Sequence, residues 1–172
     1  PNYQKNKQTT SVLEWRVLSN LMPIAIRSDK INLSSEKQTE ELAAQLLKEL
    51  KPGSIIFLYG EMGVGKTTFV RYLINKLQKN DNLAITEVTS PTFNLLNEYQ
   101  LNKIKINHYD LFRIKSHEEL KDLGLFEYSN SSITFIEWPE IIEKKPKNLI
   151  ELNFTYNDDY QSRSVQIKGL NL

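Results

Sequence analysis

The order of apolar and polar positions predicts alternating helices and strands. An apolar stripe at helical spacing follows Ser35 and predicts a helix from about residue 34 to residue 50. Ser35 and Gln38 stand three residues apart, as in a capping box, and Pro52-Gly53 ends the segment. The stripe consists of Leu42, Leu46, Leu47 and Leu50. Two further helices are predicted at 68–77 and 117–123, the last ended by Gly124.

Short apolar or alternating runs between turn residues predict strands. These runs are 55–59, 85–88, 94–101, 104–110, 133–136, 148–154 and 164–168. Asn102-Lys103 separates two of them by a tight turn, which favours an antiparallel hairpin, and the last two runs form a closing pair. The alternation predicts an α/β fold of three layers. Its central sheet should be mixed, with parallel strands around 55–59 and antiparallel hairpins beside them.

The length and composition of the chain exclude several classes of protein. Its 172 residues suit one domain, which we assign to residues 31–172, and residues 1–30 lack a clear period and are taken as an extension of unknown role. There are no cysteines and only two histidines, which excludes disulfides and argues against a zinc site. No apolar run is long enough for a membrane span, and the net charge is only +1. We expect a cytoplasmic protein without an evident basic patch for nucleic acid.

Residues 60–67, Gly-Glu-Met-Gly-Val-Gly-Lys-Thr, match the pattern G-x-x-x-x-G-K-[ST] of the nucleotide phosphate loop. The predicted strand 55–59 precedes them and the predicted helix 68–77 follows, as in the strand–loop–helix unit of proteins that bind nucleoside triphosphates. Glycines allow the backbone to wrap around phosphate oxygens with several N–H groups pointing inward. The motif predicts that Lys66 reaches the β- and γ-phosphates of a nucleotide and that the Thr67 hydroxyl binds Mg²⁺. The alternative is a glycine-rich turn without a ligand.

Two acids at strand ends are candidates for the chemistry. Glu137 follows the apolar strand 133–136, where ligands gather in open α/β sheets, and is the candidate for the magnesium side of the site. Asp110 ends the strand 104–110 and is the candidate for positioning water or a metal-bound water. A surface acid and a turn cap, respectively, are the structural alternatives. Ser90 and Thr92 are candidates for sensing the γ-phosphate, and a plain turn remains open for them.

The absence of a guanine-recognition motif argues against one kind of nucleotide-binding protein, the GTPases. A GTPase carries N-K-x-D, and the closest match, residues 75–78, lacks the Asp and lies on the wrong helix. A small-molecule kinase remains open, although a lid rich in arginine is not evident. A nucleotide-gated binding module, in which ATP controls an assembly, also remains open.

Five blocks of sequence resemble the TsaE (YjeE) family in the same order. Residues 60–68 are similar to its GDLGAGKTT loop, 90–95 with Glu98-Tyr99 to its SPTFxLxxxY stretch, and 108–113 to its HxDLYR stretch. A weaker match covers Glu119-Leu120, Leu123-Gly124 and Tyr128, and residues 137–140 match its EWPE. The resemblance spans about residues 36–168 and leaves residues 1–30 outside.

The resemblance implies the ATPase subunit of the bacterial system that makes N6-threonylcarbamoyladenosine at position 37 of tRNA. It implies Mg²⁺-dependent binding and hydrolysis of ATP, which resets a complex with TsaB- and TsaD-type subunits rather than transferring the carbamoyl group. We expect hydrolysis by the isolated chain to be slow, because the sequence shows no evident arginine finger on a dedicated loop. Contact with tRNA would be indirect or within the complex.

The same resemblance implies roles for individual residues. It places Lys66, Asp110 and Glu137 in catalysis, Thr67 and Glu137 on Mg²⁺, and Trp138 in the nucleotide site or at its rim. Arg163 would contact the nucleotide, and Glu36 and Thr39 would lie near the adenosine. The phosphates would be bound by Gly60, Glu61, Met62, Gly63, Val64, Gly65, Lys66, Thr67 and Thr68.

Overall fold

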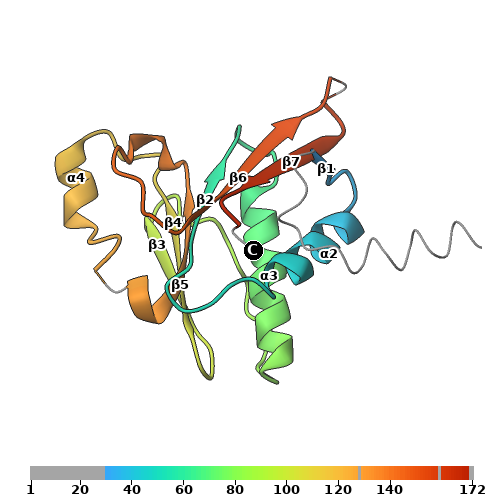
Figure 1. Ribbon diagram of the computed structural model, residues 1–172, viewed down its shortest axis with the longest axis horizontal. Helices are drawn as coiled ribbons and strands as arrows, with labels where there is room; N and C mark the ends of the chain where they lie inside the picture. The colour runs from blue at the N-terminus through green and yellow to red at the C-terminus, as the bar shows by residue number, and fades with distance from the viewer. Residues whose placement is uncertain (1–29, 128, 159, 171–172) are drawn as a thin grey trace, which may run out of the picture.

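Seven strands form one mixed sheet in the order β1-β7-β6-β2-β5-β4-β3 (Figure 1). The structure is a computed structural model that describes residues 30–127, 129–158 and 160–170. The predicted extension, residues 1–30, lies outside the described residues except for Lys30. The strands are β1 (Ile31–Asn32), β2 (Ile55–Tyr59), β3 (Leu96–Gln100), β4 (Lys105–Asp110), β5 (Ser132–Glu137), β6 (Leu149–Tyr156) and β7 (Arg163–Lys168).

The pairing of the strands confirms the predicted mixed sheet. The central strand β2 is parallel to both β5 and β6, and β4 is parallel to β5. The pairs β3–β4, β6–β7 and β1–β7 are antiparallel. The carboxyl ends of β2, β5 and β4 therefore meet at one edge, where the loop after β2 also begins.

The strand predicted at residues 85–88 is wrong. These residues belong to no strand, and part of their hydrogen bonding goes to helix α3 (Lys66–Asn80) instead. The Thr86 N–H donates to the Gln78 side-chain oxygen at 3.1 Å, and the Gln78 amide donates to the Thr86 hydroxyl at 2.8 Å. A side-chain partner on α3 has thus replaced the neighbouring strand that the apolar run suggested.

Two longer helices lie on one side of the sheet. Helix α2 (Glu36–Leu46) begins with the predicted capping box, in which the Ser35 side chain accepts from the Gln38 N–H and the Gln38 side chain accepts from the Ser35 N–H. Its α-helical part ends at Leu46, short of the predicted residue 50. Helix α4 (His117–Asp122) lies on the other side of the sheet from α3 (Figure 1). Two short 3₁₀ turns, Ser129–Ser131 and Pro139–Ile141, flank β5.

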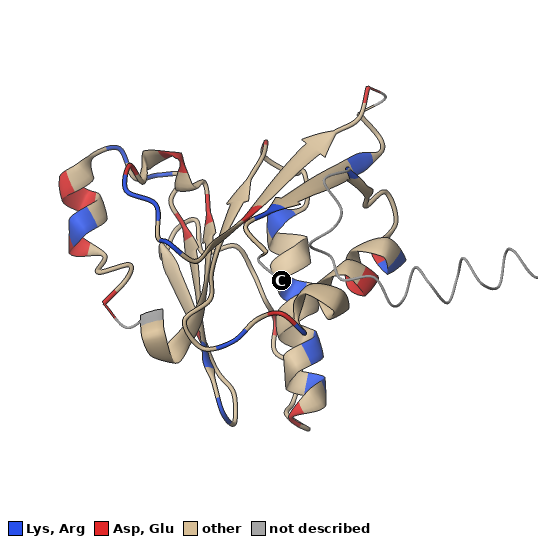
Figure 2. Ribbon diagram, viewed as in Figure 1, with Lys and Arg blue, Asp and Glu red and all other residues tan. Residues whose placement is uncertain are grey.

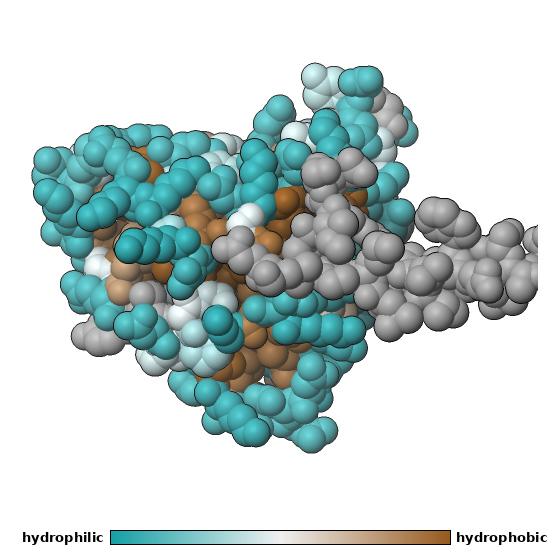
Figure 3. Space-filling view, in the orientation of Figure 1, coloured by the Kyte–Doolittle hydropathy of each residue, from teal (hydrophilic) through white to brown (hydrophobic). Residues whose placement is uncertain are grey.

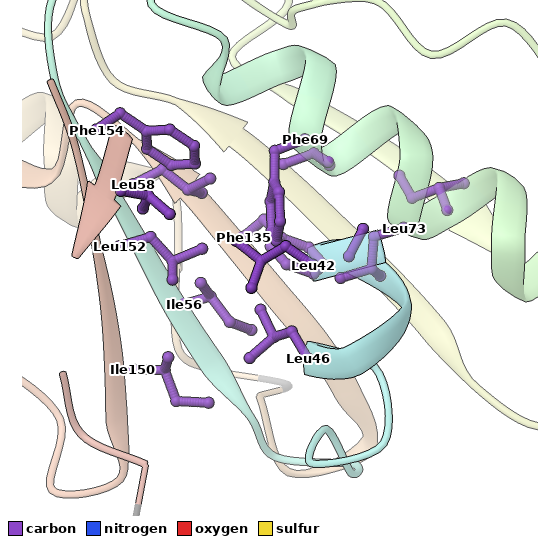
Figure 4. Packing of buried hydrophobic residues seen from close by; sticks show 14 of the residues in the cluster. Leu42, Leu46, Ile56, Leu58, Phe69, Leu73, Phe135, Ile150, Leu152 and Phe154 are labelled. Carbon is purple, nitrogen blue, oxygen red and sulfur yellow. The ribbon is translucent and has the colours of Figure 1, made fainter. Parts of the chain in front are cut away.

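The sheet separates two hydrophobic clusters, which gives the three predicted layers. The larger cluster fills the space between the sheet and helices α2 and α3, and Figure 4 shows side chains from both helices packed on those of the strands. Its fully buried members include Leu46, Ile56, Phe69 and Phe135. The smaller cluster, which includes Phe57 and Ile136, lies on the opposite face with α4 and the segments around it. Burial on both faces explains the continuous apolar runs of β2 and β5.

Charged residues of both signs are interspersed along the chain, as Figure 2 shows. The face seen in Figure 3 is mostly hydrophilic, with hydrophobic side chains visible near its centre and lower edge. In the described residues, no helix is both long and apolar enough to cross a membrane.

Candidate functional site

The glycine-rich loop joins the end of β2 to the start of α3, as its sequence predicts. Gly60 has φ +134°, and a Cβ there would lie 2.6 Å from the Phe154 carbonyl oxygen of β6. Gly65 has φ +113° and is the N-cap of α3, where no side chain caps the helix. The backbone N–H groups of the first turn are therefore left to a ligand, and the helix dipole favours an anion there. The glycines permit both the turn and the close approach.

Lys66 turns back over this loop. Its side chain is 4 % exposed, and its ammonium group donates to the carbonyl oxygens of Gly60 at 2.6 Å and Glu61 at 3.0 Å. Burial lowers the pKa of the Lys66 ammonium, while the nearby carboxylates of Glu137 and Asp110 act to raise it. The ammonium is thus held at the mouth of the loop, between backbone carbonyls and two acids.

The loop meets the two candidate acids at the sheet edge. In the parallel register of β4 and β5, Asp110 is paired with Glu137, so the two acids end neighbouring strands. The Thr67 hydroxyl donates to Glu137 Oε1 at 2.7 Å, across 70 residues of sequence. Glu137 is 3 % exposed and Asp110 is 2 % exposed. The fold therefore assembles the three residues that the sequence predicts at one site.

Asp110 organises the segment between α3 and β3. Its Oδ2 accepts from the Ser90 hydroxyl at 2.6 Å and from the Thr92 hydroxyl at 2.7 Å. Its Oδ1 accepts from the Phe112 N–H at 3.0 Å. The two hydroxyls also lie 2.8 Å apart. Three donors fix this carboxylate, which suits a residue that holds others in place better than a free base.

Trp138 lies directly after Glu137 and covers the cleft from the side of β5. It has φ +56°, which is uncommon for a residue other than glycine, and its N–H donates to the Leu58 carbonyl at 3.3 Å. Its ring lies 3.9 Å from the Lys66 ammonium, a cation–π contact, and 4.9 Å from the Phe112 ring, measured between centroids. The aromatic pair forms an apolar wall beside the charged groups.

Arg163 approaches the other side of the loop from the start of β7. A Cβ on Gly65 would lie 3.2 Å from Arg163 Nη1, which shows how closely the guanidinium packs on the loop. Arg163 Nε is buried without a hydrogen-bond partner among the described residues. The Leu33 N–H donates to the Arg163 carbonyl at 2.8 Å, and the Arg163 N–H donates to the Ser34 hydroxyl at 3.2 Å. These bonds attach the chain before α2 to the start of β7.

The residues predicted near the adenosine lie on the first turn of α2, outside the central cleft. Thr39 is buried, and its hydroxyl donates to the Ser35 carbonyl at 3.2 Å. Burial raises the pKa of the Tyr72 hydroxyl on α3, and the nearby Glu36 carboxylate raises it further. Their proximity to a nucleotide remains a prediction.

The central cleft has a volume of about 240 Å³. It is lined by Met62, Gly63, Gly65, Lys66, Thr67, Thr68, Ser90, Thr92, Asp110, Phe112, Glu137 and Trp138. Among the other loop residues, Val64 is buried in the core and is available to a ligand only through its backbone, whereas Glu61 is exposed.

The cleft combines groups for an anion with groups for a hard cation. Backbone N–H groups and Lys66 are donors for phosphate oxygens, and the Thr67 hydroxyl and Glu137 carboxylate are oxygen ligands of the kind Mg²⁺ takes. In the described part of the chain, no cluster of three His, Asp or Glu side chains offers a complete metal cage. A cation here would keep water or phosphate oxygens as further ligands, which is usual for Mg²⁺.

Sequence reasoning gave no role to two residues of this site. Phe112 lines the cleft beside Trp138. His108 is completely buried, and its Nε2 lies 2.9 Å from Glu137 Oε1. The signal for His108 was its place two residues before Asp110 on one strand, since alternate residues of a strand share a face.

The described fold and cleft define an α/β protein built on a glycine-rich strand–loop–helix unit with two strand-end acids. Residues 33–165 match the family model described as threonylcarbamoyl adenosine biosynthesis protein TsaE. The chain belongs to the TsaE family. The match agrees with the blocks that the sequence shares with this family, and residues 1–32 lie outside it.

Proteins named tRNA threonylcarbamoyladenosine biosynthesis protein TsaE are similar over most of the chain. The protein from Rickettsia bellii is 44% identical over 128 residues, which are 74% of this chain and 86% of the relative. The protein from a Nostoc species is 38% identical over 148 residues, which are 83% of this chain and 86% of the relative.

A solved structure supports the fold. The crystal structure of Bacillus subtilis YdiB superposes with a TM-score of 0.64 and covers 83% of this chain and 86% of its own. Its sequence identity is 22%, so the likeness concerns the fold alone.

Proposed function

We propose that this chain is the subunit that binds and slowly hydrolyses ATP, with Mg²⁺, in the synthesis of threonylcarbamoyladenosine at position 37 of tRNA. The observation that carries the nucleotide part is the hydrogen bond of 2.7 Å between Thr67 and Glu137, at the point where the loop enters α3. It places the hydroxyl and the carboxylate side by side at an N-terminus suited to phosphate. Membership of the TsaE family supports the place in tRNA modification.

Each side chain has a part in this proposal. The loop backbone and Lys66 bind the phosphates and balance their charge, and Thr67 and Glu137 hold Mg²⁺, which neutralises charge that develops on the transferred phosphoryl group. Asp110 fixes Ser90 and Thr92 at the cleft. Arg163 meets the nucleotide from the side of β7, where its guanidinium packs against Gly65.

We propose slow turnover by the isolated chain. The described residues contain three arginines, Arg71, Arg113 and Arg163, and none of them lines the central cleft. A charge-stabilising arginine beside the reacting phosphate is worth orders of magnitude in rate. Partner subunits of the TsaD and TsaB type would then use the nucleotide state of this chain, and tRNA contact would be indirect or within that complex.

Binding and turnover test this proposal separately. Calorimetric titration of the purified chain with ATP and Mg²⁺ should show one site, and Lys66→Ala should abolish it. Radiolabelled ATP should release phosphate slowly to water; transfer to a metabolite instead would favour a small-molecule kinase. Nucleotide binding without turnover, even with partners present, would favour a binding module.

Capture experiments test the proposed partners. The tagged chain should retain TsaD- and TsaB-type subunits from defined mixtures in a nucleotide-dependent manner. The Lys66→Ala variant is the matched control, because it keeps the surface of the chain and loses the phosphate ligand. Equal capture by both, with and without ATP, would contradict nucleotide control of the assembly.

A further inference from the structure

A buried imidazole lies beneath the acid that ends β5. His108 is on β4, two residues after Ile106, which belongs to the core between the sheet and α3. Alternate residues of a strand point to the same face, so His108 also faces α3. It is 0 % exposed and does not line the central cleft. Any action of His108 on a ligand must therefore pass through a neighbour.

That neighbour is Glu137. His108 Nε2 lies 2.9 Å from Glu137 Oε1, the same oxygen that accepts from the Thr67 hydroxyl at 2.7 Å. His108 Nδ1 is buried without a hydrogen-bond partner among the described residues. A carboxylate oxygen can only accept, so this contact requires the proton on Nε2 and fixes the tautomer. In the described chain both side-chain bonds of Glu137 fall on Oε1, which leaves Oε2 for the cleft.

The buried position of His108 is energetically unfavourable for a polar side chain. In the register of the parallel strands His108 is paired with Phe135, a fully buried core residue. An imidazole with one nitrogen unpartnered in such surroundings costs free energy that an apolar ring would not. A local cost of this kind is typical of residues that serve a site rather than the core.

We propose that His108 is a positioning residue for Glu137: its Nε2–H holds Oε1 so that Oε2 faces the cleft beside Thr67. The inference rests on the proposed role of Glu137 toward Mg²⁺. Outer partners that orient a ligand in this way set metal affinity without touching the metal, and their loss typically costs about 10–100-fold. His108 therefore determines how well the cation, rather than the phosphate chain, is bound.

Two substitutions separate positioning from packing. His108→Gln places an amide N–H near the position of Nε2, whereas His108→Phe keeps a planar ring and removes the donor. A non-hydrolysable ATP analogue is titrated by calorimetry in EDTA and then across a range of Mg²⁺ concentrations. In EDTA we expect the same affinity for the native chain and both variants. The Mg²⁺ concentration for half-maximal effect should rise about 10–100-fold for His108→Phe and only a few-fold for His108→Gln.

The titrations distinguish failure of the positioning role of His108 from failure of the proposed function. An unchanged Mg²⁺ requirement in folded His108→Phe would overturn the positioning role and leave the proposed function intact. Loss of analogue binding by His108→Phe in EDTA would also overturn it, because the effect would then be on the loop. If the native chain bound the analogue without any Mg²⁺ dependence, the proposed function would fail and this inference with it.

A second measurement does not depend on ligand or on the folding of a variant. Nitrogen-15 NMR of the imidazole side chains distinguishes the two neutral tautomers, and only His108 and His117 need to be assigned. We expect His108 to carry its proton on Nε2, with Nδ1 bare. A neutral His108 with the proton on Nδ1 would have no donor for Glu137 and would overturn the inference.

Discussion

The ammonium group of Lys66 lies 3.9 Å from the centroid of the Trp138 ring. The contact joins the first residue of α3 to the residue after β5, and Lys66 also donates to the Gly60 and Glu61 carbonyls. A phosphate oxygen that binds Lys66 competes with the ring and both carbonyls for the same ammonium. Occupancy of the loop is therefore coupled to the surroundings of one tryptophan.

We expect ATP with Mg²⁺ to change the fluorescence of Trp138. Movement of a cation away from the ring face, or a change in the packing of Phe112 on it, alters the polarity around the indole. Titration of the intrinsic fluorescence should give a saturable curve with the affinity found by calorimetry.

Two variants control this measurement. Trp138→Phe retains Trp15 as the remaining tryptophan and should lose the signal. Lys66→Ala should lose both the signal and the hydrolysis of ATP, because it removes the phosphate ligand. A full signal in Trp138→Phe would assign it to Trp15 and contradict the coupling.

Asp110→Ala should abolish hydrolysis and leave ATP affinity within about threefold of the native value, because we propose that Asp110 positions other groups and does not bind phosphate. Its carboxylate accepts from the Ser90 and Thr92 hydroxyls and the Phe112 N–H, so all three lose their anchor. Single-turnover phosphate release and calorimetry measure the two effects separately. If binding fell as severely as hydrolysis, the positioning role would be wrong.

Thr92→Val is the matched variant for this cluster. It keeps the shape of the side chain and removes one of the two hydroxyls on Asp110 Oδ2. We expect a smaller fall in turnover than for Asp110→Ala, since the Ser90 bond remains. Equal loss in both variants would assign the effect to the Thr92 hydroxyl itself.

The sequence predicted the sheet and the loop well because their signals are local. The apolar run at residues 55–59, the glycines after it and the capping box at Ser35 each report on neighbouring residues, and the structure confirms all three elements. The acids at strand ends were also found, because parallel strands bring their carboxyl ends to one edge.

Features that depend on specific hydrogen bonds between side chains of different segments were missed. The strand at 85–88 is wrong because Gln78 satisfies Thr86, a pairing that no run of apolar residues reveals. The contact of His108 with Glu137 spans 29 residues and depends on the register of β4 and β5. Apolar neighbours predict only that His108 is buried, and the partner of a buried imidazole comes from the fold.

Nucleotide affinity should fall at alkaline pH, beginning below the usual range for lysine. Burial lowers the pKa of Lys66, and its protonated form is the one that we propose binds phosphate. Nucleotide affinity should therefore be retained while Lys66 is charged and should be lost as the pH rises through its lowered pKa. Calorimetry from neutral to alkaline pH measures the curve. Lys66→Arg keeps its charge throughout, so any binding it retains should lack this fall; an identical fall would assign it to another group.

The turn at Gly60 should tolerate no side chain. At φ +134° an added Cβ would lie 2.6 Å from the Phe154 carbonyl oxygen, a backbone atom that cannot move without disturbing β6. Gly53→Ala is the control, because its φ is also positive, at +92°, but the nearest atoms to an added Cβ are 3.9 Å away. Both variants carry backbone strain of roughly 1–3 kcal/mol. The free energy of unfolding of Gly60→Ala should fall by a further amount of about 1–3 kcal/mol, because the added Cβ overlaps the Phe154 carbonyl oxygen. Urea unfolding of the two variants measures the difference in the free energy of unfolding, and equal losses would show that the overlap is relieved by movement of the loop alone.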